Sequence, residues 1–179
     1  MTESPVLIVF GSTEGHTAKL ARFAADRLRG RGLPVTLCST AEADRGFEPR
    51  DFDTTFIAAS LHWTRYQNAV TDFAQMHAGD LNRSRSAFIS ASLSAAQVSQ
   101  PGGVTLEDCD RRFQDETGWT PKAIHHAAGG IRHSAYDYFK ALTAHMLAEA
   151  RGERSEGADY YELTDYPALA AFVEQFAAA

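Results

Sequence analysis

Val6-Leu7-Ile8-Val9-Phe10 runs directly into Gly11-Ser12-Thr13-Glu14-Gly15-His16-Thr17. The five apolar residues, rich in β-branched side chains, predict a short buried strand. After Thr17 the apolar side chains recur at three- and four-residue spacing, which predicts a helix. A strand, a loop with hydroxyls and glycines, and a helix together predict a phosphate site, because the first turn of a helix presents free N–H groups and a positive dipole end.

The residues of this loop narrow the class of phosphate ligand. No lysine follows Gly15, so the loop is not a Walker motif, and the dinucleotide pattern G-x-G-x-x-G is absent. Hydroxyls and backbone N–H groups suit a terminal phosphate monoester, and the loop resembles the FMN phosphate loop of flavodoxin-like proteins. The simpler alternative is an ordinary turn capped by Ser12 or Thr13. The concentration of Ser, Thr and Gly within seven residues favours the ligand.

Composition sets the broad class of the protein. A chain of 179 residues with 44% apolar residues predicts one globular domain, residues 1–179. The net charge of −6 argues against a nucleic-acid partner. No apolar run is long enough to span a membrane and no leader pattern is present, so we expect a cytoplasmic protein. Two isolated cysteines, Cys38 and Cys109, form neither a disulfide framework nor a metal motif, and no metal is expected.

Further apolar segments alternate with helical patterns along the chain. After the first strand, we expect strands at residues 34–38, 54–60, 86–92 and 122–130, and a short extended piece at residues 160–163. Helices are expected near residues 67–77, 135–150 and 165–179. Residues 97–121 are interpreted as an insertion between the fourth and fifth strands, with a short helix capped by Thr105 and Asp108. This insertion is expected to cover the site as a lid.

The alternation predicts an α/β fold of three layers: a doubly wound, flavodoxin-like fold with a five-stranded parallel sheet of order 2-1-3-4-5. Ligands of such folds bind at the carboxyl ends of the strands, near the switch point. The loops that follow the first, third and fourth strands are therefore expected to meet at one site.

Two of these loops offer candidate walls for a flavin ring. Ser60-Leu61-His62-Trp63 stands at the end of the third strand, and Ser92-Leu93-Ser94 follows the fourth. Trp63 is expected to stack on the ring; the alternative is a loop aromatic that covers the core. Gly129 and Gly130, at the end of the fifth strand, complete the expected cofactor-binding set. No pattern identifies a catalytic acid or base. The adjacent His125 and His126 point to opposite faces of a strand and so do not share a metal.

The chain resembles one branch of the flavodoxin-like family, the quinone-dependent protoporphyrinogen oxidases of bacteria. The resemblance covers nearly the whole chain, is poorest between residues 97 and 121, and rests on residues 10–17, 59–66 with Ala69, 86–88, 92–93, 128–132 and 152–165. It implies FMN as cofactor, a porphyrinogen substrate and a quinone as electron acceptor.

The sequence departs from this branch in its charge. Those enzymes look basic in the insertion and in the following helix, as suits docking near a membrane. Here residues 97–121 are mostly acidic, and Lys140 is the only basic residue of the helix expected at 135–150. Peripheral contact with an inner membrane therefore stays open. A rival from another class is a flavodoxin-type carrier that passes electrons to a protein partner; a nicotinamide-dependent quinone reductase is disfavoured because no nicotinamide domain fits this length.

Overall fold

The computed structural model describes residues 4–42, 46–93, 95, 103–132 and 160–178. Its main sheet contains five parallel strands in the order β2-β1-β3-β5-β6, so the predicted order is confirmed. Each of them starts close to the predicted position. They are β1 (Val6–Phe10), β2 (Val35–Ser39), β3 (Thr54–His62), β5 (Arg85–Ser92) and β6 (Ala123–Ala128).

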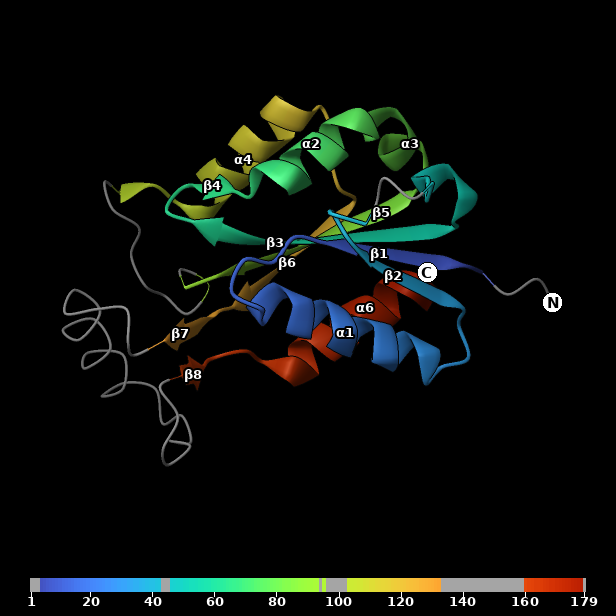
Figure 1. Cartoon of the computed structure of the whole chain (residues 1–179), viewed down its shortest axis with the longest axis horizontal. Helices are drawn as coiled ribbons and strands as arrows, with labels where there is room; N and C mark the ends of the chain where they lie inside the picture. Colours follow the sequence, from blue (N-terminus) through green and yellow to red (C-terminus); the bar gives the residue numbers. More distant parts are fainter. Residues whose placement is uncertain (1–3, 43–45, 94, 96–102, 133–159, 179) are drawn as a thin grey trace.

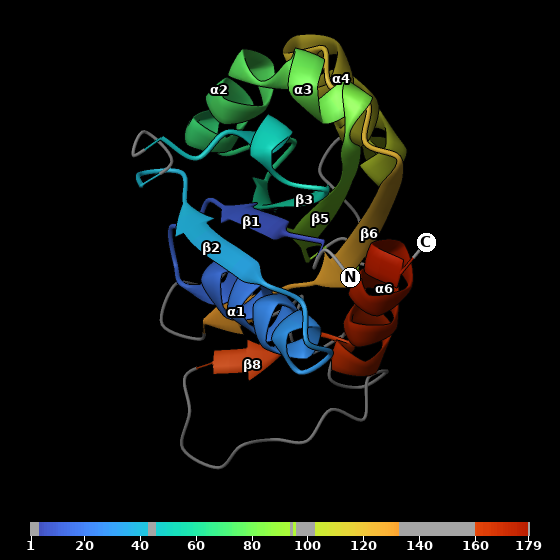
Figure 2. The same ribbon diagram turned by 90° about the vertical axis from the view of Figure 1, so that its right-hand side faces the viewer.

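Helices cover both faces of the sheet (Figures 1 and 2). One face carries α1 (His16–Arg29) and α6 (Tyr166–Ala178), and the other carries α2 (Asn68–Met76), α3 (Ala78–Arg83) and α4 (Leu106–Thr117). A single turn of 3-10 helix, η2 (Pro49–Asp51), precedes β3. No helix within the described ranges is both long enough and apolar enough to cross a lipid bilayer.

Because both faces are covered, the sheet packs into two separate cores. On the α1/α6 side, Leu20 and Leu28 of α1 meet Phe56 of β3 and Leu169 of α6. On the other side, Phe88 of β5 is surrounded by residues of the helical layer and of the following loop: Val70, Phe73, Cys109, Phe113 and Trp119. Cys109 is buried in this core, as expected of a packing residue.

The end of β3 differs from the prediction. The strand extends to His62 and pairs with a two-residue strand, β4 (Arg65–Tyr66), so residues 61–66 form a tight hairpin where a loop was expected. The pairing of Leu61 with Tyr66 and of His62 with Arg65 leaves only Trp63 and Thr64 in the turn.

The structure corrects the role expected for residues 97–121. Thr105 and Asp108 do form a capping box, which confirms the predicted helix start. However, α4 lies in the helical layer beside α2, and its Phe113 is buried in the core together with Trp119 of the following loop. Parallel neighbours such as β5 and β6 need a crossover helix, and α4 is that crossover. The described part, residues 103–121, is therefore core structure and not a lid.

Two other predictions need comment. In the helix predicted near residues 67–77, either Met76 or Ala74 could complete the apolar face; Ala74 is buried and Met76 is 74% exposed. The helix expected at 135–150 lies outside the described residues. On either side of that region, β7 (Gly130–Arg132) and β8 (Tyr160–Glu162) pair antiparallel, which confirms the extended piece predicted at 160–163.

Candidate functional site

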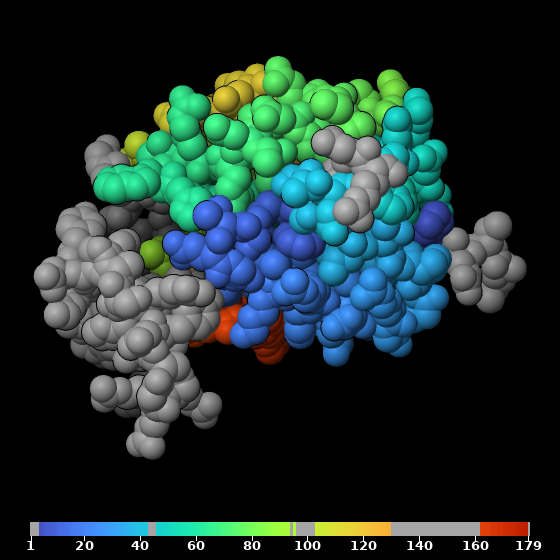
Figure 3. Space-filling view, in the orientation of Figure 1, coloured from blue at the N-terminus to red at the C-terminus, as the bar shows by residue number. Residues whose placement is uncertain are grey.

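The loops that follow β1, β3, β5 and β6 meet at the carboxyl edge of the sheet. Hydrogen bonds tie neighbouring loops to one another: Gly11 N–H donates to Ala58 O (3.0 Å) and Gly129 N–H to Ser92 O (2.9 Å). In the space-filling view, the blue residues of the β1–α1 loop and the green residues of the β3–β4 region lie at the same end of the molecule (Figure 3). The predicted convergence of these loops is confirmed by the sheet register.

The β1–α1 loop has the geometry of an open anion cradle. Ser12, Thr13, Glu14 and Gly15 are all exposed, and Ser12 Oγ accepts a hydrogen bond from Gly15 N–H at 3.0 Å. Gly15 has a φ of 89°, and no atom lies within 4 Å of the position that a Cβ would take. The open space at Gly15 therefore lies at the start of α1, where the positive end of the helix dipole attracts an anion.

Thr17 and Gly11 anchor this cradle to the core. Thr17 is buried in the first turn of α1. A Cβ on Gly11 would lie 2.4 Å from Val70 Cγ2 of α2, which is too close for any side chain. The loop is thus fixed at both ends while its centre stays exposed.

His16 connects the cradle to the end of β8. Its Nε2 lies 3.2 Å from Thr164 Oγ1, which in turn donates to Ala128 O at 2.7 Å. Glu162 of β8 also forms an ion pair with Lys19 of α1. Burial lowers the pKa of His16, only partly offset by the nearby Glu162 carboxylate, so the imidazole favours its neutral form.

The β3–β4 hairpin is the first candidate ring wall. Ser60 Oγ accepts from Gln67 Nε2 at 2.7 Å and lies 3.0 Å from His62 Nε2, and Leu61 is buried. Trp63 is 72% exposed, with a φ of 61°. A two-residue hairpin turn with positive φ at its first position normally uses glycine, so tryptophan there carries backbone strain of about 1–2 kcal/mol. Trp63 does not cover the core, and its ring is available to a ligand.

The loop after β5 is the second candidate wall. Ser92 is buried, and its Oγ accepts a hydrogen bond from Ala95 N–H at 3.1 Å. Leu93 is half-buried, and Ser94 lies outside the described residues. At the end of the neighbouring strand β6, Gly129 is buried against the backbone of Ser92, and Gly130 begins β7.

A buried polar cluster beneath the hairpin escaped the sequence analysis. Tyr66 Oη lies 2.8 Å from Ser90 Oγ and donates to Asp110 Oδ1 at 2.8 Å, and His126 Nε2 lies 3.0 Å from Asp110 Oδ2. Burial, followed by the Asp110 charge, raises the pKa of Tyr66, so the phenol stays protonated and can donate. As predicted, the two strand histidines face opposite sides, since His125 stacks on Phe172 of α6.

Comparison with known proteins identifies the family of this site. A family model described as a flavodoxin domain matches residues 7–156. The chain belongs to the flavodoxin family. The fold is similar to that of oxidised flavodoxin 1 from Bacillus cereus, with a TM-score of 0.57 at 15% identity over 98% of both chains.

Curated relatives point to one branch of the family. The chain is 26% identical to a protoporphyrinogen IX dehydrogenase [quinone] of Escherichia coli (strain K12), over 96% of this chain and 93% of the relative. It is 23% identical to a protein of the same name from Leishmania major, over 99% of this chain and 77% of the relative. These relatives confirm the resemblance drawn from the sequence.

The family and the loop geometry together support FMN as the cofactor. The chemistry of the donors fits a phosphate monoester: hydroxyls, backbone N–H groups and a helix start, with an open space at Gly15. The hairpin at Trp63 and the loop at Leu93 stand at the same edge of the sheet as the cradle.

Proposed function

We propose that this protein is an FMN-dependent oxidoreductase that oxidises protoporphyrinogen to protoporphyrin and reduces a quinone. One observation carries the proposal. This chain, which has a flavodoxin domain, matches nearly the whole length of a relative named for this activity. Bound FMN would supply the redox chemistry, and the protein would bind, orient and tune it.

Most of the predicted site residues then have a proposed task. Ser12, Thr13, Gly15 and the N–H groups around His16 and Thr17 hold the phosphate, while the exposed Glu14 carboxylate points its charge to solvent at the loop rim. Trp63 stacks on the ring and His62 lines its edge. On the other side, the Ser92–Leu93 backbone faces the ring, and Gly129 and Gly130 keep the adjacent backbone close. No residue is proposed as a catalytic acid or base.

The experiment has two stages that separate cofactor from substrate. Cofactor released from purified protein is identified by mass spectrometry, with FMN expected and FAD excluded. The FMN-loaded protein is then mixed anaerobically with protoporphyrinogen and a menaquinone analogue, and both protoporphyrin fluorescence and quinol are measured. Because the oxidation removes six electrons from each porphyrinogen and each quinone accepts two, formation of three quinols for every protoporphyrin supports the proposal. Bound FMN without any porphyrin formation would overturn the substrate assignment.

A second function, electron transfer to a protein partner, is favoured by the net charge of −6, which would steer a basic partner to the flavin edge. Chemically reduced protein is mixed with a basic cytochrome at rising ionic strength. A fast, salt-sensitive reduction together with absent porphyrinogen turnover would favour the carrier.

A further inference from the structure

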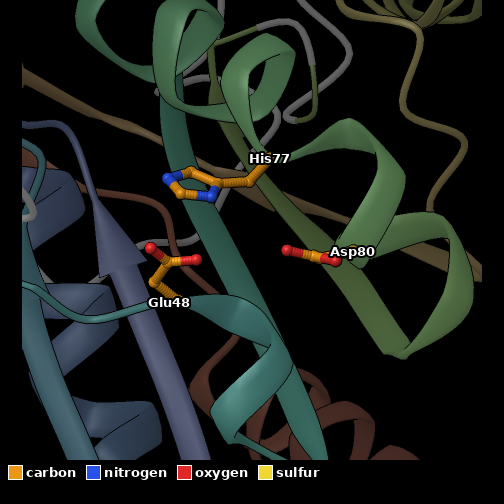
Figure 4. Close-up of side chains that lie close together, drawn as sticks. All are labelled: Glu48, His77 and Asp80. Carbon is orange, nitrogen blue, oxygen red and sulfur yellow. The ribbon is translucent and has the colours of Figure 1, made fainter.

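Three potential metal ligands meet at the edge of the sheet opposite to the flavin loops. Glu48 directly precedes η2, His77 joins α2 to α3, and Asp80 lies in the first turn of α3. One ligand atom from each side chain lies within 4.8 Å of those of the other two. Because η2 leads into β3 and α3 leads into β5, the group stands at the amino ends of these strands (Figure 4).

The backbone fixes the relative positions of these three groups. Asp80 N–H donates to His77 O at 3.0 Å, which holds His77 and Asp80 together at the start of α3. The His77 imidazole packs against the Phe73 ring, with centroids 4.6 Å apart, and this contact limits its rotation. Glu48 approaches from a segment 29 positions earlier in the chain, so the group joins two parts of the fold. Figure 4 shows the imidazole and both carboxylates directed into the same space.

The polar contacts of the group leave room for a cation. Arg50 pairs with Glu48 Oε2 at 2.9 Å and Arg83 pairs with Asp80 Oδ1, so each arginine engages one oxygen of its carboxylate. Both arginines are exposed side chains, and their partners are near in sequence. Within this described cluster, no hydrogen bond or ion pair links His77 directly to either carboxylate. Each carboxylate therefore keeps a second oxygen, and these oxygens together with the imidazole nitrogen are the atoms that a divalent ion would bind.

We propose that Glu48, His77 and Asp80 bind one divalent transition-metal ion of the zinc class, with water at the remaining position. Zinc accepts imidazole nitrogen and carboxylate oxygen at about 2.0–2.2 Å, which places ligand atoms roughly 3–3.5 Å apart in a tetrahedral site. Partly exposed side chains reach that spacing by small inward rotations. The imidazole selects against Mg²⁺ and Ca²⁺, which prefer oxygen ligands.

A bound ion would join η2 to α3 and so stabilise the layer that carries α2. Binding to the folded state alone raises the melting temperature by mass action. For a chain of this size, zinc at about 100 times its Kd is expected to raise Tm by about 5–10 °C. The site is separate from the flavin edge, so FMN binding is expected to stay unchanged and a failure here leaves the proposed function untouched.

The test is a calorimetric titration of the chelator-treated, full-length protein with Zn²⁺ alone. The chain has seven histidines, several of which attract zinc weakly, so variants decide the assignment. Loss of one ligand is expected to weaken zinc binding at least about tenfold, in the range found when metal sites are perturbed. His77→Ala removes the imidazole, and Glu48→Gln removes one charge at constant size, which covers the case in which His77→Ala fails to fold.

Asp72→Asn is the matched control, because Asp72 is an exposed acid on α2 outside the group. It should bind zinc like the wild type. Mg²⁺ should not raise the Tm of the wild type, and Zn²⁺ should not raise the Tm of Glu48→Gln. Equal zinc affinity in the wild type, Glu48→Gln and Asp72→Asn, or no zinc binding at all, would overturn the proposal.

Discussion

The hydroxyl of Tyr66 donates to Asp110 Oδ1 at 2.8 Å and thereby ties the hairpin that carries Trp63 to α4, 44 residues further along the chain. Asp110 is only 6% exposed, and a buried carboxylate is stable only when its oxygens are satisfied. Tyr66 serves one oxygen and His126 the other. The cluster therefore holds the candidate ring wall in place from below.

Removal of the Tyr66 hydroxyl should destabilise the protein more than the loss of an ordinary, solvent-exposed hydrogen bond would. In Tyr66→Phe, one oxygen of the buried Asp110 loses its donor, and the expected loss is about 1–3 kcal/mol of unfolding free energy. Urea denaturation measures it. The double variant Tyr66→Phe/Asp110→Asn should lose less than the sum of the two single variants. Strict additivity would show that the two residues do not act together.

Gly15→Ala should weaken FMN binding, whereas Gly32→Ala should not. Both glycines have positive φ, and neither has an atom within 4 Å of a Cβ position, so the backbone strain on substitution is similar, about 1–2 kcal/mol. Only Gly15 lies in the proposed phosphate cradle. Fluorescence titration with FMN separates the two effects, and denaturation confirms that the stability losses match. Equal FMN affinity in both variants would show that the phosphate does not bind in this loop.

Trp63→Gly should lower FMN affinity without a large loss of stability. The side chain is 72% exposed, and glycine relieves the positive φ at this turn position. If Trp63 stacks on the ring, the FMN affinity falls by about 1–3 kcal/mol, as for base–aromatic stacking. Met76→Ala, an equally exposed residue away from the edge, is the control. The tryptophan emission quenched by FMN should disappear in Trp63→Gly, leaving the signal of the buried Trp119.

The helix start and the strand runs were readable from sequence because their signals are local. The capping residues Thr105 and Asp108 are only three positions apart, and the apolar run of β1 is continuous. The Tyr66–Asp110–His126 cluster was missed because its members lie in separate segments and no short pattern connects them. For the same reason the group at Glu48, His77 and Asp80 shows no metal motif in the sequence.

The role of residues 103–121 was misread for a different reason. Helical periodicity predicts that a helix has an apolar face, but it does not predict which part of the protein that face packs against. The lid was expected because this stretch follows the fourth strand at the carboxyl edge of the sheet, next to the predicted site; α4 instead packs Cys109 and Phe113 into the core and buries Asp110. A parallel β5–β6 pair requires such a crossover, and topology was the better guide.

Phe113→Ala tests that correction directly. Phe113 stacks on Phe88 with centroids 4.9 Å apart, and loss of a buried phenylalanine is expected to cost about 3–5 kcal/mol. Thr105→Ala, which removes only the cap, should cost about 1 kcal/mol. Thermal unfolding followed by circular dichroism measures both. A lid residue would leave stability unchanged, so a loss near zero for Phe113→Ala would restore the lid interpretation.

The stability of the flavin-free protein should fall as the pH drops below about 6.5. Burial lowers the pKa of His16, and burial followed by the neighbouring His126 lowers the pKa of His125 from the ordinary value of 6.5. As the pH falls, these two histidines take up protons more readily in the unfolded chain than in the folded chain, so acid favours unfolding. Urea denaturation between pH 7 and pH 5 should show a smaller loss in His16→Gln and in His125→Gln than in the wild type. An unchanged pH dependence in both variants would contradict this assignment.

The pairing of β7 with β8 has a consequence for how this chain tolerates change. The two strands pair antiparallel, and Glu162 and Thr164, at and just after the end of β8, fasten this pair to α1 and to β6. A substitution at Glu162 or Thr164 would therefore be felt at once by the helix that begins at the phosphate cradle and by the last strand of the sheet.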